Sequence, residues 1–273
     1  MQRRSFFEHL RPWVRTARFA LVPLVVVAAL GLLPSGILGA QESASLSVFE
    51  LIVMQRVGGN GPDQYRITTS GTGFFIAPDG TALTTSHVVY PAYLDPAGHR
   101  LLAIVNGEFY GVRILSADPL PYDPTDRRAA GVPMTRDVAT IRLSAPEVPF
   151  DQLVFGGGAP VVAHRGAMPS FPALTLGGDP APGERIRVFG FGRSASPIPH
   201  GWSAQGTVDG SMTIAGGTLV FDATFTLATE PGHSGSPVLD SRNRVVGMWA
   251  WHSATNPAAG TAISSSALGA PAR

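Results

Sequence analysis

Short apolar segments alternate with turns rich in glycine, proline and asparagine along the chain from residue 46 onward. These segments contain many β-branched and aromatic residues, whereas long stretches with the 3.6-residue period of a helix are scarce. Two pairs of them are predicted hairpins that turn at Asp79-Gly80 and Asn106-Gly107, because such dipeptides adopt the positive φ of a tight turn. Further strands are predicted at 46–54, 136–144, 184–192, 217–227 and 244–252. The pattern predicts an all-β protein.

The strands fall into two groups on either side of a segment rich in small residues and proline. This segment, 156–172, is predicted to be a linker, so that one β unit spans 41–155 and a second spans 173–273. The 32 glycines and 24 prolines of the 273-residue chain fit many turns between short strands. The sequence therefore predicts two β units in one globular protein.

The first 40 residues have the layout of an export signal. Five arginines precede an uncharged, mostly apolar run of 22 residues, 19–40, which ends in small residues. The opening QRRSFF also resembles the twin-arginine export signature, which leaves that route open beside general secretion. An uncut run of this length would anchor the chain in a bilayer, although its prolines and glycines favour cleavage. We expect an exported protein, periplasmic or secreted, that contacts a membrane only if the signal is retained.

Cysteine and lysine are both absent from the sequence. Their absence excludes thiol nucleophiles, disulfides, cysteine-bound zinc, Schiff bases, Ser-Lys dyads and the phosphate-binding P-loop. A formal net charge of +1 without a block of like charges gives no reason to expect a nucleic-acid partner. Any covalent nucleophile is therefore a hydroxyl activated by histidine, and we expect neither a metal nor another cofactor.

The segment EPGHSGSP, residues 230–237, has two interpretations. It resembles the nucleophile elbow of an α/β-hydrolase esterase and also the nucleophile loop of a chymotrypsin-like protease. An elbow requires G-x-S-x-G, but its fifth position here is Ser236, and only 39 residues follow Ser234. The β-α alternation of that fold is also missing upstream. The esterase interpretation therefore lacks the rest of its fold.

Three motifs follow in the order histidine, aspartate, serine: TTSHVV at His87, RDVATIRL at Asp137 and PGHSGSPV at Ser234. They resemble the motifs of the trypsin-like serine peptidases, and in particular the disulfide-free bacterial branch with HtrA-type and glutamyl-endopeptidase-type enzymes. The resemblance covers about 46–268. It implies two six-stranded antiparallel β-barrels with the active-site cleft between them, and a C-terminal helix truncated to about one turn. No segment resembles a PDZ domain.

The resemblance assigns a role to each motif residue. His87, expected in a short turn after a strand, is the general base that takes the proton of the Ser234 nucleophile. Asp137 orients the imidazole and stabilises its protonated form. The backbone N–H groups of Gly232 and Ser234 form the oxyanion hole. The expected reaction is hydrolysis of a polypeptide substrate by an endopeptidase through an acyl-enzyme.

Two positions depart from the family pattern. His233 stands where many trypsin relatives carry the acid that binds a newly cut N-terminus, so we expect activity without such cleavage and a side chain that points away from Ser234. Ala250 stands where many relatives place a serine hydroxyl near the catalytic acid. Asp137 is therefore expected to rely on backbone donors near Ser86 and His87.

The substrate pocket is expected to differ from that of trypsin. The resemblance places Ala228 at the base of the primary pocket and Gly260 on its wall, so a basic side chain has no counter-charge there. Thr229 is similar to the glutamyl enzymes, but Trp249 occupies the position of their pocket histidine, which disfavours acidic specificity. A small or apolar residue before the scissile bond is therefore expected. The other expected cleft residues are Ala250, Trp251 and His252.

A non-enzymatic alternative remains open at this stage. A pseudoprotease that only binds polypeptides would keep the three motif residues but have a collapsed oxyanion loop. The sequence is the same in both cases, because only the geometry of that loop would differ.

Overall fold

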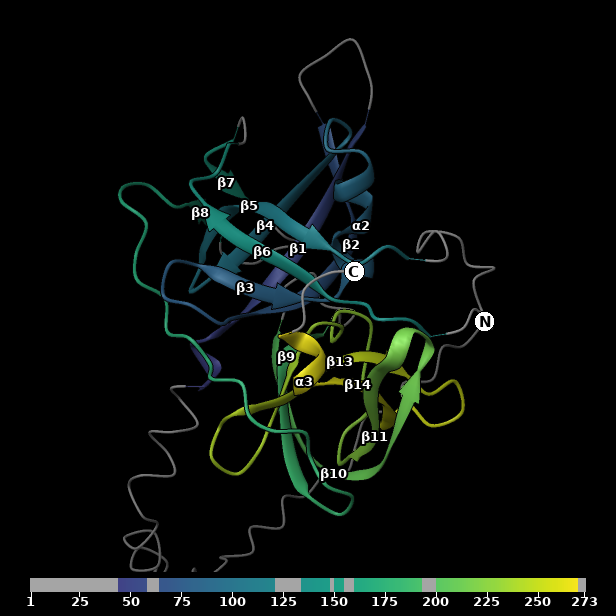
Figure 1. Ribbon diagram of the computed structural model, residues 1–273. Coiled ribbons are helices and arrows are strands. Elements are labelled where there is room, and N and C mark those ends of the chain that lie inside the picture. The colour runs from purple at the N-terminus through teal and green to yellow at the C-terminus, as the bar shows by residue number, and fades with distance from the viewer. Residues whose placement is uncertain are drawn as a thin grey trace, which may run out of the picture.

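The chain is described by a computed structural model that covers residues 44–57, 64–120, 134–147, 150–154, 160–192 and 200–269 (Figure 1). The predicted export signal at 1–40 lies outside these ranges. Within them, no helix has both the length and the apolar character needed to cross a membrane. Two β-barrels make up the fold: the first is coloured purple to teal in Figure 1 and the second green to yellow.

The first barrel closes with six antiparallel strands in the order β4-β1-β2-β3-β6-β5, because β5 pairs back to β4. Two short strands, β7 and β8, extend this sheet beyond β5, and the β5–β8 pair is parallel. The strands are β1 Val48–Val57, β2 Gln64–Phe75, β3 Thr81–Thr84, β4 His99–Val105, β5 Glu108–Ala117, β6 Ala139–Ser144, β7 Gln152–Leu153 and β8 Val161–Ala163. Both predicted hairpin turns are confirmed: Gly80 has φ 83°, and Asn106 and Gly107 have φ 50° and 82°.

The second barrel is also closed, in the order β10-β11-β14-β13-β12-β9. Its strands are β9 Arg185–Gly192, β10 His200–Ile214, β11 Thr218–Phe225, β12 Pro237–Leu239, β13 Val245–His252 and β14 Ala259–Ser264. Numbered within each barrel, both rings have the same order, 1-2-3-6-5-4. The predicted all-β fold of two six-stranded barrels is therefore confirmed.

Alternation along the strands builds the barrel interiors. Phe49, Leu51 and Val53 of β1 point into the core of the first barrel, whereas Ile52 packs in a separate cluster on the other face. A third cluster of buried residues joins the barrels. It contains Val48, Phe74 and Leu83 from the first barrel with Phe189, Leu239 and Met248 from the second. This shared apolar contact fixes the two halves of the site relative to each other.

The segment predicted as a linker, 156–172, is packed rather than free where it is described. It contains β8, and Phe171 lies in the core of the first barrel. Leu174, three residues later, belongs to the cluster between the barrels. The chain thus leaves the first barrel between these two residues.

The described ranges also contain the helix α2 Ser86–Leu94, the 3₁₀ turn η2 Ala215–Gly217 and the helix α3 Ser265–Leu268. The helix α2 corrects the expectation of a short turn at His87, because it runs for nine residues. Burial explains the difference, since Val88, Val89 and Ala92 pack into the first barrel, and this packing outweighs the weak helix preference of the two valines. The single turn of α3 agrees with the truncated C-terminal helix.

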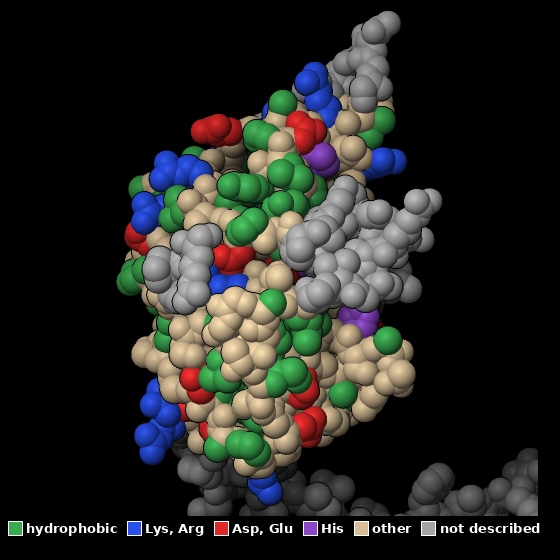
Figure 2. Space-filling view, turned by 45° about the vertical axis from the view of Figure 1, so that its right-hand side comes forward, with side chains coloured by type: hydrophobic (Ala, Val, Ile, Leu, Met, Phe, Trp, Pro, Cys, Tyr) green, Lys and Arg blue, Asp and Glu red, His purple; other side chains and the backbone are tan. Residues whose placement is uncertain are grey.

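Some apolar side chains of the described chain are exposed, such as Leu94 and Val154, which are 62% and 63% exposed. In the space-filling view of Figure 2, most arginines lie apart from one another near the edges of the face. The visible face therefore has no continuous basic patch.

Candidate active site

The first barrel brings His87 and Asp137 together through paired strands. His87 follows β3 in the first turn of α2, and Asp137 lies two residues before β6. Because β3 and β6 are antiparallel neighbours, with Thr84 opposite Ala139, both residues lie at the same edge of the sheet. The Asp137 carboxylate accepts two hydrogen bonds from His87: one from Nδ1 at 2.6 Å and one from the backbone N–H at 2.9 Å. The second bond agrees with the expected backbone donor.

The environment of this pair sets its charge. The Asp137 side chain is 2% exposed and that of His87 is 22% exposed. Burial of the imidazole lowers its pKa, but the charge and hydrogen bond of Asp137 outweigh burial and raise the pKa of His87 above its usual value. With Nδ1 donating to Asp137, the neutral ring presents an unprotonated Nε2.

A second carboxylate, missed by sequence reasoning, clamps both neighbours of Asp137. Asp118, 4% exposed, accepts a hydrogen bond from the Val138 backbone at 2.9 Å and from Arg136 Nη1 at 2.9 Å. Burial raises the pKa of Asp118. Arg136 also donates through Nε to the Ala267 carbonyl in α3 at 3.0 Å. The clamp therefore ties the entrance of β6 to the C-terminal helix.

The nucleophile loop, residues 230–236, is built from backbone turns. Gly232 and Gly235 have φ of 104° and 89°, a region that favours glycine. Thr72 of β2 holds the loop: its hydroxyl donates to the Gly232 carbonyl at 2.9 Å and its N–H donates to the Ser234 carbonyl at 2.8 Å. The first barrel thus fixes the loop that carries the nucleophile of the second.

The loop leaves two backbone donors available. Counting only described residues as partners, the N–H groups of Gly232 and Ser234 make no hydrogen bond inside the protein. Their neighbour His233 donates its N–H to the Glu230 carbonyl at 3.1 Å, so that peptide is occupied in a turn. The pattern is that of a loop with donors free to bind an anion.

His233 is packed away as a neutral ring. It is 1% exposed, stacks on Trp202 with centroids 4.0 Å apart, and accepts a hydrogen bond on Nδ1 from the Glu230 N–H at 2.9 Å. Burial lowers the pKa of His233 to about 4. Its ring is therefore uncharged at neutral pH.

His87 and Ser234 line one cleft of about 190 Å³ between the barrels. Thr69, Ser70 and Val88 line it on the side of the first barrel. On the side of the second barrel the lining residues are Glu230, Pro231, Gly232, Trp249, Ala250 and His252. Sequence reasoning did not select Thr69 or Ser70, because neither carries a recognisable motif.

Only part of the expected substrate pocket reaches this cleft. Ala250 and His252 line it, but Ala228, Thr229, Trp251 and Gly260 do not. Ala228 is exposed on the surface, and the Thr229 hydroxyl donates to the Pro257 carbonyl at 2.9 Å. Trp251 packs against the cluster between the barrels. The cleft as it stands is therefore formed without these four residues.

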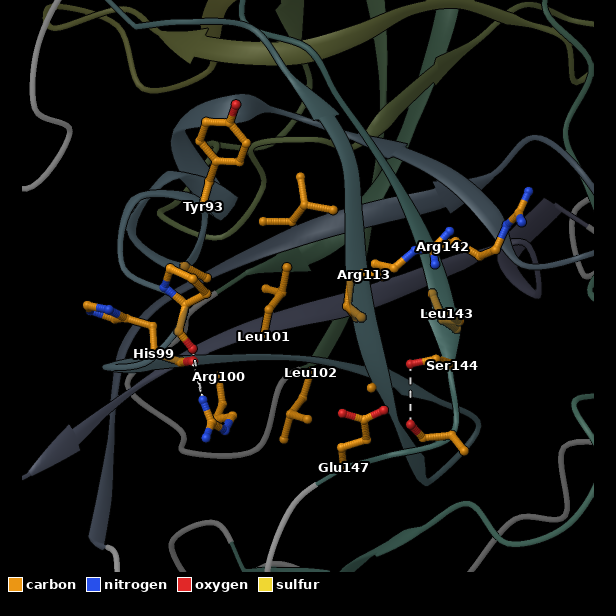
Figure 3. Close-up of a pocket in the computed structure, with 16 residues that line it drawn as sticks. Tyr93, His99, Arg100, Leu101, Leu102, Arg113, Arg142, Leu143, Ser144 and Glu147 are labelled. Atoms are coloured by element: carbon orange, nitrogen blue, oxygen red, sulfur yellow. Dashed lines mark hydrogen bonds between the residues drawn. The ribbon is translucent and has the colours of Figure 1, made fainter.

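A larger hollow of about 790 Å³ lies on the first barrel (Figure 3). Its walls come from the end of α2, β4, β5 and β6. Figure 3 shows Tyr93 and His99 on one side, and Arg113 and Arg142 on neighbouring strands of the other. It contains none of the three motif residues, so its size does not make it the active site.

No group of three or more histidine, aspartate or glutamate side chains within the described residues is arranged to hold a metal ion.

Comparisons with known proteins agree with the architecture. The family model of the trypsin-like peptidase domain matches residues 71–248. The active form of the Rv3671c protease from M. tuberculosis is 17% identical, with a TM-score of 0.53 over 93% of this chain and 91% of that one. The HtrA-type protease AlgW, solved with a decapeptide, is 15% identical, with a TM-score of 0.57 over 84% of this chain and 64% of that one. No match was found among curated protein sequences.

At such low identities the structural likeness shows the fold, whereas the family match rests on the sequence itself and spans most of the described chain. It includes the histidine, aspartate and serine motifs in their order. The chain therefore belongs to the trypsin-like peptidase family and is a serine-type endopeptidase.

Proposed function

We propose that the protein hydrolyses peptide bonds through an acyl-enzyme, with Ser234 as nucleophile, His87 as general base and Asp137 as the residue that orients the base. The observation that carries the proposal is the doubly hydrogen-bonded His87–Asp137 pair, whose histidine lines one cleft with Ser234. A hydroxyl needs a base of near-neutral pKa to attack a carbonyl, and this pair supplies it.

The first step transfers the Ser234 proton to Nε2 of His87 while Oγ attacks the scissile carbonyl. Asp137 stabilises the imidazolium that forms, and the imidazolium then protonates the leaving amine. A water molecule repeats the sequence on the acyl-enzyme and releases the acid. The raised pKa of His87 favours the protonated intermediate.

The oxyanion of each tetrahedral intermediate is proposed to bind the N–H groups of Gly232 and Ser234. Their freedom from acceptors among the described residues supports this role. The bonds from Thr72 to the loop hold these donors in place before substrate binds. Loss of one such donor typically costs about 2.7 to 4 kcal/mol in the transition state.

Two further features complete the proposal. The neutral, buried His233 supports activity without capture of a new N-terminus, because it forms no ion pair that such an amine would require. Export is proposed from the signal-like residues 1–40. N-terminal sequencing of the protein from the periplasm or medium tests export. Extra residues placed before the mature N-terminus should leave activity largely unchanged.

A fluorophosphonate probe tests the catalytic assignment. The wild-type protein should form a covalent adduct at Ser234, Ser234→Ala should form none, and His87→Ala should react far more slowly. Cleavage of a peptide mixture should follow the same order. A protein that binds peptides but forms no Ser234-dependent adduct would contradict the proposal and favour the pseudoprotease.

A further inference from the structure

We infer that the Trp249 indole closes the primary pocket, so that this peptidase accepts only very small residues, glycine, alanine or serine, before the scissile bond. The inference rests on the proposed function, because it concerns the side chain next to the bond that Ser234 attacks. It replaces the expectation of a pocket formed by Ala228 and Gly260.

The backbone fixes Trp249 beside the nucleophile. Its N–H donates to the Ser236 carbonyl at 2.9 Å, and its carbonyl accepts the Gly235 N–H at 2.8 Å. Both partners follow Ser234 directly in the chain, and Trp249 lines the same cleft as Ser234. A substrate side chain entering next to Ser234 therefore meets this residue.

The indole fills the space that a deeper pocket would need. It is 2% exposed and packs edge-to-face on Phe225 of β11, with centroids 4.9 Å apart. A methyl group built on Gly260 of β14 would lie 2.6 Å from Trp249 Cζ2, so the ring lies directly against the Gly260 backbone. The same position lies 2.1 Å from the Trp251 carbonyl oxygen, so the Trp249 indole and the backbone of β13 together separate Gly260 from the cleft.

The remaining volume limits the size of the substrate residue. The cleft measures about 190 Å³ in all, and typical ligand pockets begin at about 300 Å³. Access to the base and nucleophile takes part of this volume. A leucine or phenylalanine side chain would have to displace an indole that is packed on two strands, whereas glycine, alanine and serine need no such movement.

The test uses a mixture of peptides that differ only in the residue before the scissile bond, with cleavage read by mass spectrometry. Wild-type protein should cleave after alanine at least about tenfold faster than after leucine or phenylalanine. Trp249→Val should raise cleavage after leucine and phenylalanine relative to alanine by about tenfold or more. Phe221→Leu, which shortens another aromatic residue of the same core without reaching the cleft, should keep the wild-type preference.

Labelling of Ser234 by the fluorophosphonate probe accompanies each variant. If wild-type protein is labelled but cleaves equally well after alanine and phenylalanine, the inference is wrong and the proposed function stands. If the Trp249→Val variant is labelled but keeps the wild-type preference, the inference is likewise wrong and the proposed function stands. If no protein is labelled at Ser234, both the proposed function and the inference fail. If Trp249→Val does not fold, the wild-type preference still tests the predicted exclusion of large side chains, and equal cleavage after alanine and phenylalanine still overturns the inference.

Discussion

The two barrels have the same strand order but hold their halves of the site by different interactions. The first barrel positions His87 through carboxylates, with Asp137 bonded to the ring and Asp118 clamping both neighbours of Asp137. Ser234 of the second barrel is held by backbone turns, by hydrogen bonds from Thr72 of the first barrel, and by aromatic packing around Trp249. The same strand order thus supports one half of the active site that is held by charged groups and another half that is held by packing. The first half should respond to changes of charge and the second to changes of volume.

Removal of one charge from the first barrel should have the largest effect. Asp137→Asn keeps the shape of the side chain but removes the charge and favours the wrong imidazole tautomer. We expect kcat to fall by about 10⁴-fold. Peptide hydrolysis near neutral pH measures the loss. A decrease in kcat of less than about tenfold would contradict the role of Asp137. It would also show that charge does not hold the first barrel's half of the site.

A larger side chain in the nucleophile loop should disrupt the second barrel's half of the active site. In Gly235→Ala the new methyl group would lie 2.0 Å from the Thr72 carbonyl oxygen, at a φ of 89°. Strain of about 1 to 3 kcal/mol adds to this clash, so we expect loss of Ser234 labelling and a large fall in unfolding free energy. Gly107→Ala is the matched control, since its φ is 82° but nothing lies within 4 Å. Labelling of Gly107→Ala should persist, and equal labelling of both variants would contradict the packing argument.

A buried acid of the first barrel should make the protein less stable as the pH rises from acidic to mildly alkaline values. Glu50 is 6% exposed, and burial raises its pKa to about 8. The folded protein then holds a proton that the unfolded chain releases above about pH 4.5, so the free energy of unfolding falls as the pH rises from 4.5 to 8. Glu50→Gln should remove this fall, which amounts to a few kcal/mol at most. Urea unfolding of Ser234→Ala with and without Glu50→Gln, at pH 5 and 8.5, measures it; equal pH dependence would contradict it.

A buried histidine of the second barrel should make the protein less stable as the pH falls. His233, with a pKa of about 4, stays neutral in the folded protein while the unfolded chain takes up a proton below about pH 6.5. The free energy of unfolding therefore falls as the pH drops from 6.5 to 4, by about 3 kcal/mol at most. His233→Asn, which keeps an acceptor for the Glu230 N–H, should flatten this fall in the Ser234→Ala background. The same acid sensitivity in both proteins would show that another group is responsible.

The smallest effects should come from the clamp on Asp137. Asp118→Asn removes a negative charge near the His87–Asp137 pair and should move the acid limb of kcat/KM to lower pH by a few tenths of a unit. Arg136→Gln removes a positive charge and should move it to higher pH by a similar amount. A purely structural clamp would lower the rate without these opposite shifts. Shifts in the same direction would therefore contradict an electrostatic role.

The sequence predicted most of the fold and the three motif residues because these signals are local. The dipeptides Asp79-Gly80 and Asn106-Gly107 need a positive φ wherever they occur between strands, and the apolar segments predicted the barrel strands. The helix α2 was missed because tertiary burial of its valines, not local preference, stabilises it. Thr72 was missed because it meets Gly232 across 160 residues of chain.

The sequence by itself determined the all-β architecture, the order of His87, Asp137 and Ser234, and the exclusion of thiol and amine nucleophiles, since each follows from residue types and spacing. Only the tertiary structure decided which side chains fill the pocket and what supports the site. The space around Trp249 depends on how β11, β13 and β14 pack, and the Asp118 clamp depends on contacts between distant segments. Spacing along a chain carries no information on either, because packing is decided by which surfaces meet in three dimensions.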